Sequence, residues 1–421
     1  MWCGIGLAAL LFAGGACAAP PSTPTSVLAR ADGTGEIASV EEWEQDARPR
    51  ILEFFGREVW PIPPKPDSIA FALAERSGSA LGGLAERRQY TVTVKGKGGQ
   101  RSFSVLVYLP KAESSRGKVP AFICQNFYGN HTVSSEPEVF IPTCPHLRKS
   151  PAGMAEREAM RGTKHSRVPV ADIVSRGFAI ATFCYSEIYP DFGGKDGSAD
   201  SIYTIFAPGE SGEKTALGAW AWADMRARDL IEMLPEIDQS RVALAGHSRL
   251  AHTAAVAAAN DTRFACVCLN NGGGKSIRLW PNLLYPVWMS ENMRRYVNLN
   301  VTGVPAHELE RLRAEGGWPD PPYDQWHLLA CVAPRLLYID AASRCTTAPP
   351  DIQLKAILNA CPVFRLYGKT NLPGAGFAGE TGCVFHGDVG YHVKEGPHSI
   401  TEFDWKNFMD FLEKHGWNAG K

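Results

Sequence analysis

The segment Arg241–Leu250 carries a serine in a setting that suits nucleophilic chemistry. Its aliphatic run predicts a buried strand, and Gly246 then lets the chain turn tightly at Ser248 into an alanine-rich stretch that predicts a helix. A strand, a tight turn and a helix expose a serine Oγ at the carboxyl end of a sheet, beside backbone N–H groups that can bind an oxyanion. Leu250 stands where the usual pattern has a second glycine, so the alternative is a serine that caps a helix.

A serine nucleophile needs a general base, and His398 is the histidine best placed to serve. Where such an elbow is used, the chain order is nucleophile, acid, histidine, so the base lies late in the sequence. His398 lies in the polar stretch that begins at Gly390, which we expect to be a loop that leads into the amphipathic segment Thr401–Lys414. His386 and His392 are competitors, and plain surface exposure is the alternative for a loop histidine. The serine and this histidine together would transfer an acyl group.

Strand-like and helix-like stretches alternate along the chain and would hold these two residues. Besides the run before Ser248, the expected strands are Arg88–Val94 and Phe103–Leu109, which form a hairpin, then Val119–Cys124, Phe178–Phe183, Phe264–Leu269, Arg335–Ile339 and Val363–Tyr367. The expected helices are Val40–Trp60, Pro169–Ser175, Ala216–Leu234, Ala251–Ala259 and Thr401–Lys414. The alternation predicts an α/β-hydrolase fold, a three-layer α/β sandwich with a mostly parallel central sheet, which binds ligands at the carboxyl ends of its strands.

Composition and charge fit one large soluble domain. The chain has 421 residues, of which 45% are hydrophobic and 21% charged, and its formal net charge is −1. It can therefore bury a sizeable core, and it has no overall charge that would attract nucleic acid or an acidic membrane. We expect a monomer with a single domain over residues 40–421, preceded by a flexible segment over residues 20–39. No segment after the leader is long and apolar enough to span a bilayer.

The first residues have the pattern of a secretory leader. Residues 5–15 are apolar, and Ala16-Cys17-Ala18 resembles a cleavage site, so we expect residues 1–19 to be a signal peptide and the protein to be secreted or periplasmic. A lipoprotein anchored through Cys17 is the alternative. Of the 11 cysteines, Cys3 and Cys17 lie in the leader, which leaves nine in the mature chain. No Cys/His spacing indicates a structural zinc site.

Several motifs, taken in chain order, resemble carbohydrate esterase family 15, the glucuronoyl esterases. They are Asn126–Thr132, Ile188–Phe192, Gly246–Leu250, Asp324–Arg335 and the group Gly390–His392, His398 and Asp404–Trp405. The resemblance covers residues 40–415. It implies hydrolysis of esters between 4-O-methyl-glucuronic acid on xylan and alcohols of lignin, by a serine mechanism without a metal or other cofactor. The partner would be a uronic-acid-containing polysaccharide or its esters.

The resemblance also implies roles for residues at the elbow. Ser248 would attack the uronoyl carbonyl, His398 would take its proton, and Arg249 would stabilise the oxyanion. A guanidinium suits that role because it stays charged at every relevant pH. An unrelated acyl hydrolase on the same fold, such as a lipase or a peptidase, would fit the elbow but not the other motifs.

Four residues are expected to contact the sugar. Gln325 and Trp326 match a segment that lines the sugar pocket in the family. Trp288 could stack on a pyranose face, and the alternative for each tryptophan is a place in the core. His252 stands where the family has a lysine that holds a uronate hydroxyl, so a fixed cation is replaced by a titratable imidazole.

The acid of the triad is where the sequence departs from the family. The family places this acid at one of two positions. The first lies 23 residues after the serine and here holds Asn271. The second follows the strand that begins at Arg335 and here holds Ser343–Cys345, with Asp340 as the acidic residue nearby. An asparagine can orient a histidine but cannot compensate the imidazolium charge, and the same exchange in a serine-protease triad lowers turnover by about 10⁴. We therefore expect weak or altered activity, which Asn271→Glu would raise. The alternative is a catalytically silent carbohydrate-binding homologue.

Overall fold

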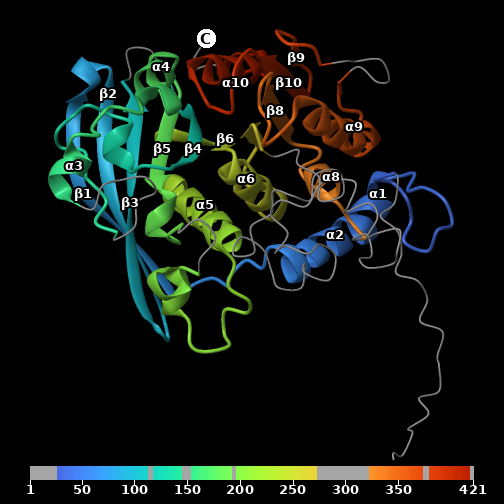
Figure 1. The fold of residues 1–421 in the computed structure, drawn as a ribbon, viewed down its shortest axis with the longest axis horizontal. Helices are drawn as coiled ribbons and strands as arrows, with labels where there is room; N and C mark the ends of the chain where they lie inside the picture. Colours follow the sequence, from blue (N-terminus) through green and yellow to red (C-terminus); the bar gives the residue numbers. More distant parts are fainter. Residues whose placement is uncertain are drawn as a thin grey trace, which may run out of the picture.

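One sheet of ten strands runs through the molecule, with helices against both of its faces (Figure 1). The structure, a computed structural model, describes residues 26–111, 117–144, 153–191, 196–272, 322–372 and 379–417. Of the helices in these ranges, none is long and apolar enough to cross a bilayer.

The sheet is mixed, but its central strands are parallel. In order across the sheet the strands are β1 (Ser68–Ala80), β2 (Ala85–Gly96), β3 (Gly99–Pro110), β5 (Ala179–Cys184), β4 (Val119–Asn126), β6 (Ile237–His247), β7 (Cys266–Asn270), β8 (Leu336–Ala342), β10 (Val389–Lys394) and β9 (Val384–His386). The pairs from β5 to β10 are parallel, and β1 to β3 and β9 pair antiparallel. The predicted α/β-hydrolase fold is confirmed, and the segments that follow β6, β8 and β10 meet at one edge of the sheet.

The helices are the second and third layers of this sandwich. The longer ones are α5 (Ala216–Glu232), α6 (Arg249–Asn260), α9 (Pro350–Leu366) and α10 (Glu402–Lys414). The shorter ones are α1 (Val40–Glu42), α2 (Arg48–Phe54), α3 (Met154–Glu158), α4 (Val170–Ser175) and α8 (Gln325–Ala330). Two π-helical turns, η1 (Trp43–Ala47) and η2 (Phe55–Val59), join and extend α1 and α2, so that Val40–Val59 is one helical segment, as predicted. The 3₁₀ turns are η3 (Leu81–Gly83), η4 (Asn130–Thr132), η5 (His165–Arg167), η6 (Tyr185–Glu187), η7 (Ser198–Asp200) and η8 (Ile202–Ile205).

Alternate residues of the central strands point into two hydrophobic clusters. In β6, Val242 and Leu244 belong to the cluster that includes α5, α6, α8 and α9. Ala243 and Ala245 belong to the cluster that includes α4 and α10. Successive side chains of a strand point to opposite faces, so the sheet is buried on both sides, as a parallel sheet requires.

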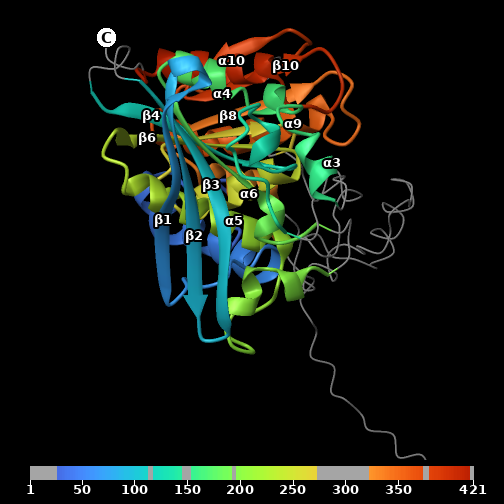
Figure 2. The ribbon, with the colours of Figure 1, turned by 90° about the vertical axis from the view of Figure 1, so that its left-hand side faces the viewer.

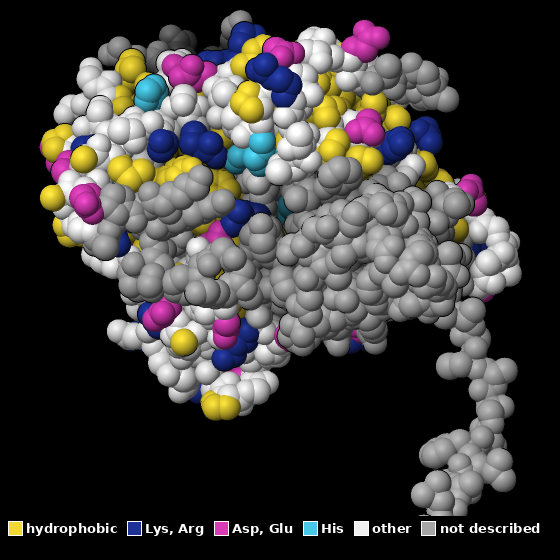
Figure 3. All heavy atoms as spheres, in the orientation of Figure 1, with side chains coloured by type: hydrophobic (Ala, Val, Ile, Leu, Met, Phe, Trp, Pro, Cys, Tyr) yellow, Lys and Arg dark blue, Asp and Glu magenta, His cyan; other side chains and the backbone are white. Residues whose placement is uncertain are grey.

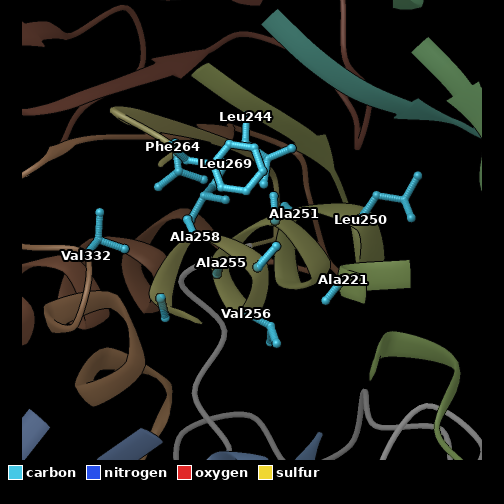
Figure 4. Packing of buried hydrophobic residues seen from close by; sticks show 14 of the residues in the cluster. Ala221, Leu244, Leu250, Ala251, Ala255, Val256, Ala258, Phe264, Leu269 and Val332 are labelled. Atoms are coloured by element: carbon cyan, nitrogen blue, oxygen red, sulfur yellow. The ribbon is translucent and has the colours of Figure 1, made fainter. Parts of the chain in front are cut away.

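Helix α6 lies close to the sheet because its buried face is built largely of alanines. Ala251, Ala255 and Ala258 lie in one cluster with Leu244 and Leu269 of the adjoining strands (Figure 4). Residues three and four apart share one face of a helix, and methyl side chains let that face approach the strands closely. This packing fixes the first turn of α6 relative to the end of β6.

One predicted strand is wrong. Val363–Tyr367 lies at the end of α9 instead, because its apolar residues Val363 and Phe364 form part of the buried face of that helix. The strand beside β8 is β10, in a stretch that we expected to be a polar loop. Its polar residues hid it, since His392 and Lys394 are buried next to polar partners rather than exposed to water.

The N-terminal part of the described chain adds two features. The predicted hairpin is present as β2 and β3, and the long strand β1, which the sequence analysis did not include, extends it into a three-stranded antiparallel flank (Figure 2). Residues 26–39 fall within the segment predicted to be flexible. Val27 and Ile37 are nevertheless buried in the larger hydrophobic cluster, so this part of the segment is held by packing.

Candidate active site

Ser248 lies on a sharp turn between β6 and α6. Its backbone has φ 59° and ψ −125°, a left-handed φ that non-glycine residues rarely adopt. The turn leaves no room for side chains around it. A Cβ on Gly246 would lie 2.1 Å from the carbonyl oxygen of Leu250, and a Cβ on Gly272 would lie 2.2 Å from the carbonyl oxygen of Ser248. The Ser248 side chain makes no capping hydrogen bond to α6, so the geometry is that of a nucleophile elbow.

His398 lies beside this serine. It follows β10 in the loop before α10, and its Nε2 is 2.8 Å from Ser248 Oγ, within hydrogen-bond distance. Both residues are partly exposed, so a substrate can reach them. The two residues are 150 positions apart in the chain, and they are the pair predicted from the sequence.

The other ring nitrogen of His398 faces a thiol and a hydroxyl. Nδ1 is 3.0 Å from Cys345 Sγ and 3.1 Å from Thr347 Oγ1. Both side chains lie on the segment that follows β8, where this fold commonly places the acid of a triad. A hydrogen bond from Nδ1–H to either atom leaves the Nε2 lone pair directed at Ser248.

Asn271 does not make the predicted contact with the His398 ring. Its Nδ2 donates to Asp340 Oδ1 at 3.1 Å and to the carbonyl oxygen of Ser399 at 3.1 Å. It therefore supports the histidine loop one residue away from the ring. Asp340 is buried and accepts two hydrogen bonds from Asn270 Nδ2, at 2.7 and 2.8 Å, so its carboxyl group is engaged behind the site.

Behind the site lies a buried polar network. Burial, and then the charge of Asp404, raise the pKa of Asp340 well above its ordinary value. Burial also acts to raise the pKa of Asp404, but a hydrogen bond from His392 at 2.9 Å and the charge of Lys394 outweigh it and hold that pKa below its ordinary value. Lys394 Nζ also donates to the carbonyl oxygen of Ser399 at 2.5 Å. The network thus ties β8, β10 and α10 to the loop that carries His398.

The same network is the place where a metal would be considered. Within the described ranges, one group of side chains lies close enough together to bind a metal ion. It consists of Asp340, His392 and Asp404, whose ligand atoms lie within 4.8 Å of one another. Their acidic atoms already accept hydrogen bonds from an ammonium group, an imidazole and amide groups. A cation would have to displace the ammonium of Lys394, so the donor set fits an internal ion pair better than a metal.

Arg249, the first residue of α6, is held beside the elbow by an ion pair. Its Nη1 donates to Asp191 Oδ2, and Asp191 also accepts a hydrogen bond from the Tyr185 hydroxyl at 2.9 Å. The guanidinium carbon lies 6.0 Å from the centre of the Phe127 ring. Both members of the ion pair are largely buried, so the guanidinium is held in one place next to the end of the serine turn. The first N–H groups of α6 lie at this same point, where a helix leaves its donors without intrahelical partners.

Two of the predicted sugar contacts lie together. Gln325, the first residue of α8, has its Nε2 2.5 Å from His252 Nδ1, so the amide donates and the imidazole accepts. Trp326 is only 3% exposed and belongs to the larger hydrophobic cluster, which fits the core alternative. Trp288 lies outside the described residues.

On the face shown in Figure 3, histidine side chains reach the surface near the middle, with Lys and Arg side chains close by.

Three residues that the structure places at the site had no role predicted from the sequence. Asp191 belongs to the motif Ile188–Phe192, but its role as the ion-pair partner of Arg249 can be recognised only in the folded protein. Thr347 carries no pattern of its own. Cys345 was noted because it stands where a carboxylate was expected. It lies three residues after the end of β8, and this position is the signal that could have suggested a contact with the histidine.

Comparison with known proteins gives one consistent result. The family model described as "Glucuronyl esterase, fungi" matches residues 149–368. The carbohydrate esterase MZ0003, from an unknown prokaryotic organism, is 27% identical over 415 residues, which cover 94% of this chain and 90% of that protein. The 4-O-methyl-glucuronoyl methylesterase of Podospora anserina is 25% identical over 325 residues, which cover 72% of this chain and 52% of that protein. The structure of a glucuronoyl esterase from Solibacter usitatus superposes with a TM-score of 0.78 at 28% identity and covers 94% of this chain and 98% of that one.

Proposed function

Because this chain belongs to the glucuronoyl esterases of carbohydrate esterase family 15, we propose that it is a serine esterase that cleaves esters of uronic acids. The single observation that carries the proposal is the contact of 2.8 Å between Ser248 Oγ and His398 Nε2 on a strained turn. Esters of 4-O-methyl-glucuronic acid, as in glucuronoxylan linked to lignin, are the first substrates to consider, because a relative of this chain is a 4-O-methyl-glucuronoyl methylesterase.

The proposed reaction has two steps. His398 Nε2 takes the proton of Ser248 Oγ as the oxygen attacks the ester carbonyl, and the same nitrogen then protonates the departing alcohol. Water hydrolyses the acyl-serine by the reverse use of the same groups. The oxyanion of each tetrahedral intermediate would lie at the amino end of α6, where backbone N–H groups and the guanidinium of Arg249 can stabilise it.

The sugar would bind above the first turns of α6 and α8. The side chains of His252 and Gln325 are buried, and the hydrogen bond from the Gln325 amide to His252 Nδ1 would make them a rigid polar support beneath the sugar. Trp288 keeps its expected role as a stacking surface. Trp326 would support this region from the core instead of touching the ligand.

We further propose that turnover is lower than a carboxylate-supported triad would give. The groups beside His398 Nδ1, a thiol and a hydroxyl, are neutral in their ordinary forms, so the imidazolium formed during attack is compensated less. A catalytically silent carbohydrate-binding homologue is the second candidate, and this same observation favours it. We also propose that the protein is exported through its N-terminal leader and acts as a monomer with one catalytic domain.

The experiment compares three proteins on two esters. Wild type, Ser248→Ala and Ser240→Ala are assayed with benzyl glucuronate and with a simple acetyl ester. Ser240 is a matched control, because it lies on the same strand, β6, is exposed, and bonds only within its own turn to Asp238. We expect cleavage of the uronate that Ser248→Ala abolishes and Ser240→Ala leaves unchanged.

The other outcomes decide between the alternatives. Serine-dependent cleavage of the acetyl ester alone would mean that the substrate has changed. No serine-dependent turnover on either ester, together with measurable binding of a glucuronoxylan oligosaccharide by calorimetry, would establish the carbohydrate-binding homologue.

A further inference from the structure

We propose that Cys345 is the third member of the triad, a positioning residue whose sulfur accepts the Nδ1–H of His398 and, once ionised, compensates the imidazolium. The inference rests on the proposed function only in requiring that Ser248 is activated by His398. It names no substrate.

The sulfur of Cys345 lies among hydrogen-bond donors. Its distance to His398 Nδ1 is 3.0 Å, the backbone N–H of Ala348 donates to it at 3.2 Å, and the Thr347 hydroxyl is 3.6 Å away. The side chain is buried, with Ala342 and Ala348 packed around it. A sulfur that faces an imidazole, an amide N–H and a hydroxyl is placed to accept hydrogen bonds.

The position of Cys345 in the fold is the one that a triad acid takes. It follows the end of β8 at Ala342, and the segments after β6, β8 and β10 share one edge of the parallel sheet. The chain order is therefore Ser248, Cys345, His398, which is the order nucleophile, acid, base of this fold. The carboxyl group that lies nearest in sequence, Asp340, is directed to Asn270 and Asn271.

The proton movements distinguish a thiol from a thiolate. In both forms the sulfur can accept Nδ1–H, which orients the ring and leaves the Nε2 lone pair for the proton of Ser248. Only the thiolate adds a negative charge next to the imidazolium. The thiol proton goes to solvent before the reaction and takes no part in it, so the reaction on Ser248 should speed up as Cys345 ionises at alkaline pH. A hydroxyl such as that of Thr347 does not ionise in this range.

Other groups around the pair do not produce the same pH dependence. The His247 ring, on β6, has its centroid 4.8 Å from that of His398, and burial lowers the pKa of His247 well below its ordinary value, so it is already neutral when the thiol ionises. Lys394, on β10, is paired with Asp404. Arg167, from the turn before α4, acts on His247 as a fixed charge.

Within the part of the chain that the structure describes, the remaining groups on neighbouring elements keep a constant charge or lie at the surface. Burial first, and then Asp404, raise the pKa of Asp340, on β8, but its side chain is turned to the asparagines and not to the thiol. Arg344 and Glu395 form an exposed ion pair at 3.6 Å, which solvent screens. Among the described residues, the thiol is therefore the group beside Nδ1 whose ionisation would be read out through His398.

The test follows the covalent labelling of Ser248 by a fluorophosphonate, whose rate reports how strongly His398 activates the serine, whatever the natural ester is. Rates are measured from mildly acidic to alkaline pH for wild type, Cys345→Ser, Cys345→Asp and Thr347→Val, with Ser248→Ala as the blank. Cys383→Ser, on the turn before β9, is the control for loss of a thiol elsewhere.

We expect the wild-type rate to rise in two steps, first as His398 loses its proton and again at alkaline pH. Cys345→Ser should lose the second step and react about 30-fold more slowly at alkaline pH, because a charge-assisted hydrogen bond becomes a neutral one. Cys345→Asp should also lose the second step but react faster than Cys345→Ser at neutral pH, because its charge is present throughout. Thr347→Val should change the rate at every pH but still show both steps, because the hydroxyl it removes does not ionise in this range, and Cys383→Ser should match wild type.

An alkaline step that persists in Cys345→Ser or Cys345→Asp would overturn the inference, and so would a wild type that the probe does not label. The aspartate variant keeps the test decisive if the serine variant does not fold, with thermal unfolding as the check. Labelling that follows the expected profile in a protein that cleaves no uronate ester would refute the proposed substrate and leave the role of Cys345 standing. Serine-dependent cleavage of benzyl glucuronate with an unchanged labelling profile in Cys345→Ser would support the proposed substrate and refute the role of Cys345.

Discussion

Gly246→Ala should damage the elbow by an amount that the structure allows us to work out. A Cβ at this position would lie 2.1 Å from the carbonyl oxygen of Leu250 and 2.6 Å from its carbonyl carbon, both of which are backbone atoms of the first turn of α6. Ordinary contact begins at 3.4 Å, so β6 and α6 must separate by about 1 Å. They are held by the alanine packing described above (Figure 4) and cannot separate without opening it.

That separation would move Ser248 relative to His398, which lies on a different segment. A misplacement of about 1 Å at a reacting group costs about 100-fold in turnover. Forcing an extra methyl into a close-packed contact also lowers the free energy of unfolding by about 1–3 kcal/mol. We therefore expect kcat on benzyl glucuronate and the rate of fluorophosphonate labelling to fall together by about 100-fold, with a smaller effect on KM.

The assay compares Gly246→Ala with Gly56→Ala at a temperature well below the unfolding midpoint of both. Gly56 is a matched control, since it lies in the helical turn η2, has no positive φ and has nothing within 4 Å of an added Cβ. Its variant should keep full activity. Full activity of a folded Gly246→Ala would refute the assignment of this turn as the element that places the nucleophile.

Three further outcomes are expected. Asp191→Asn should lower kcat about 10- to 100-fold with an intact fold, because Arg249 loses the charge that holds it in place; steady-state kinetics measure this. Asp404→Asn should cost about 3 kcal/mol at neutral pH by leaving Lys394 buried without its counter-charge, as denaturant unfolding would show. Because the pKa of Asp404 is held below its ordinary value, its charge stabilises the fold above that value, and the difference between wild type and variant should shrink as the pH falls through the lowered pKa. Asn271→Glu, which the sequence alone suggests would raise turnover, should give no gain in the ester assay, because it removes both donated hydrogen bonds behind the site.

Local patterns in the sequence predicted the turn at Ser248, and chain order predicted the histidine that lies beside it. The turn at Ser248 was indicated by Gly246 and by the strand and helix patterns on either side of it, and His398 follows from the order of functional residues in this fold. The error at Val363–Tyr367 has a physical cause, since a short segment with apolar residues such as Val363 and Phe364 buries equally well in a strand and on one face of a helix. The strand β10 was hidden because two of its buried side chains are polar and find partners only in the folded protein.

The support of the histidine could not be predicted from the chain alone. Cys345 and His398 are 53 positions apart, and their contact depends on how far the segments after β8 and β10 extend beyond the sheet. Asn271 was the natural choice because it occupies a family position for the acid. Its side chain turns to Asp340 and the Ser399 carbonyl oxygen, and no sequence pattern specifies that direction.

The most direct measurement is the mass of the protein during turnover of benzyl glucuronate. The reaction is stopped with acid, and the peptides are analysed for a glucuronoyl group. We expect a glucuronoyl group on the peptide that contains Ser248, and none in Ser248→Ala. The reason is that the acyl-serine is the intermediate that the elbow and His398 would form. Release of glucuronic acid with no acyl group on Ser248, and with activity retained in Ser248→Ala, would show that another group performs the reaction.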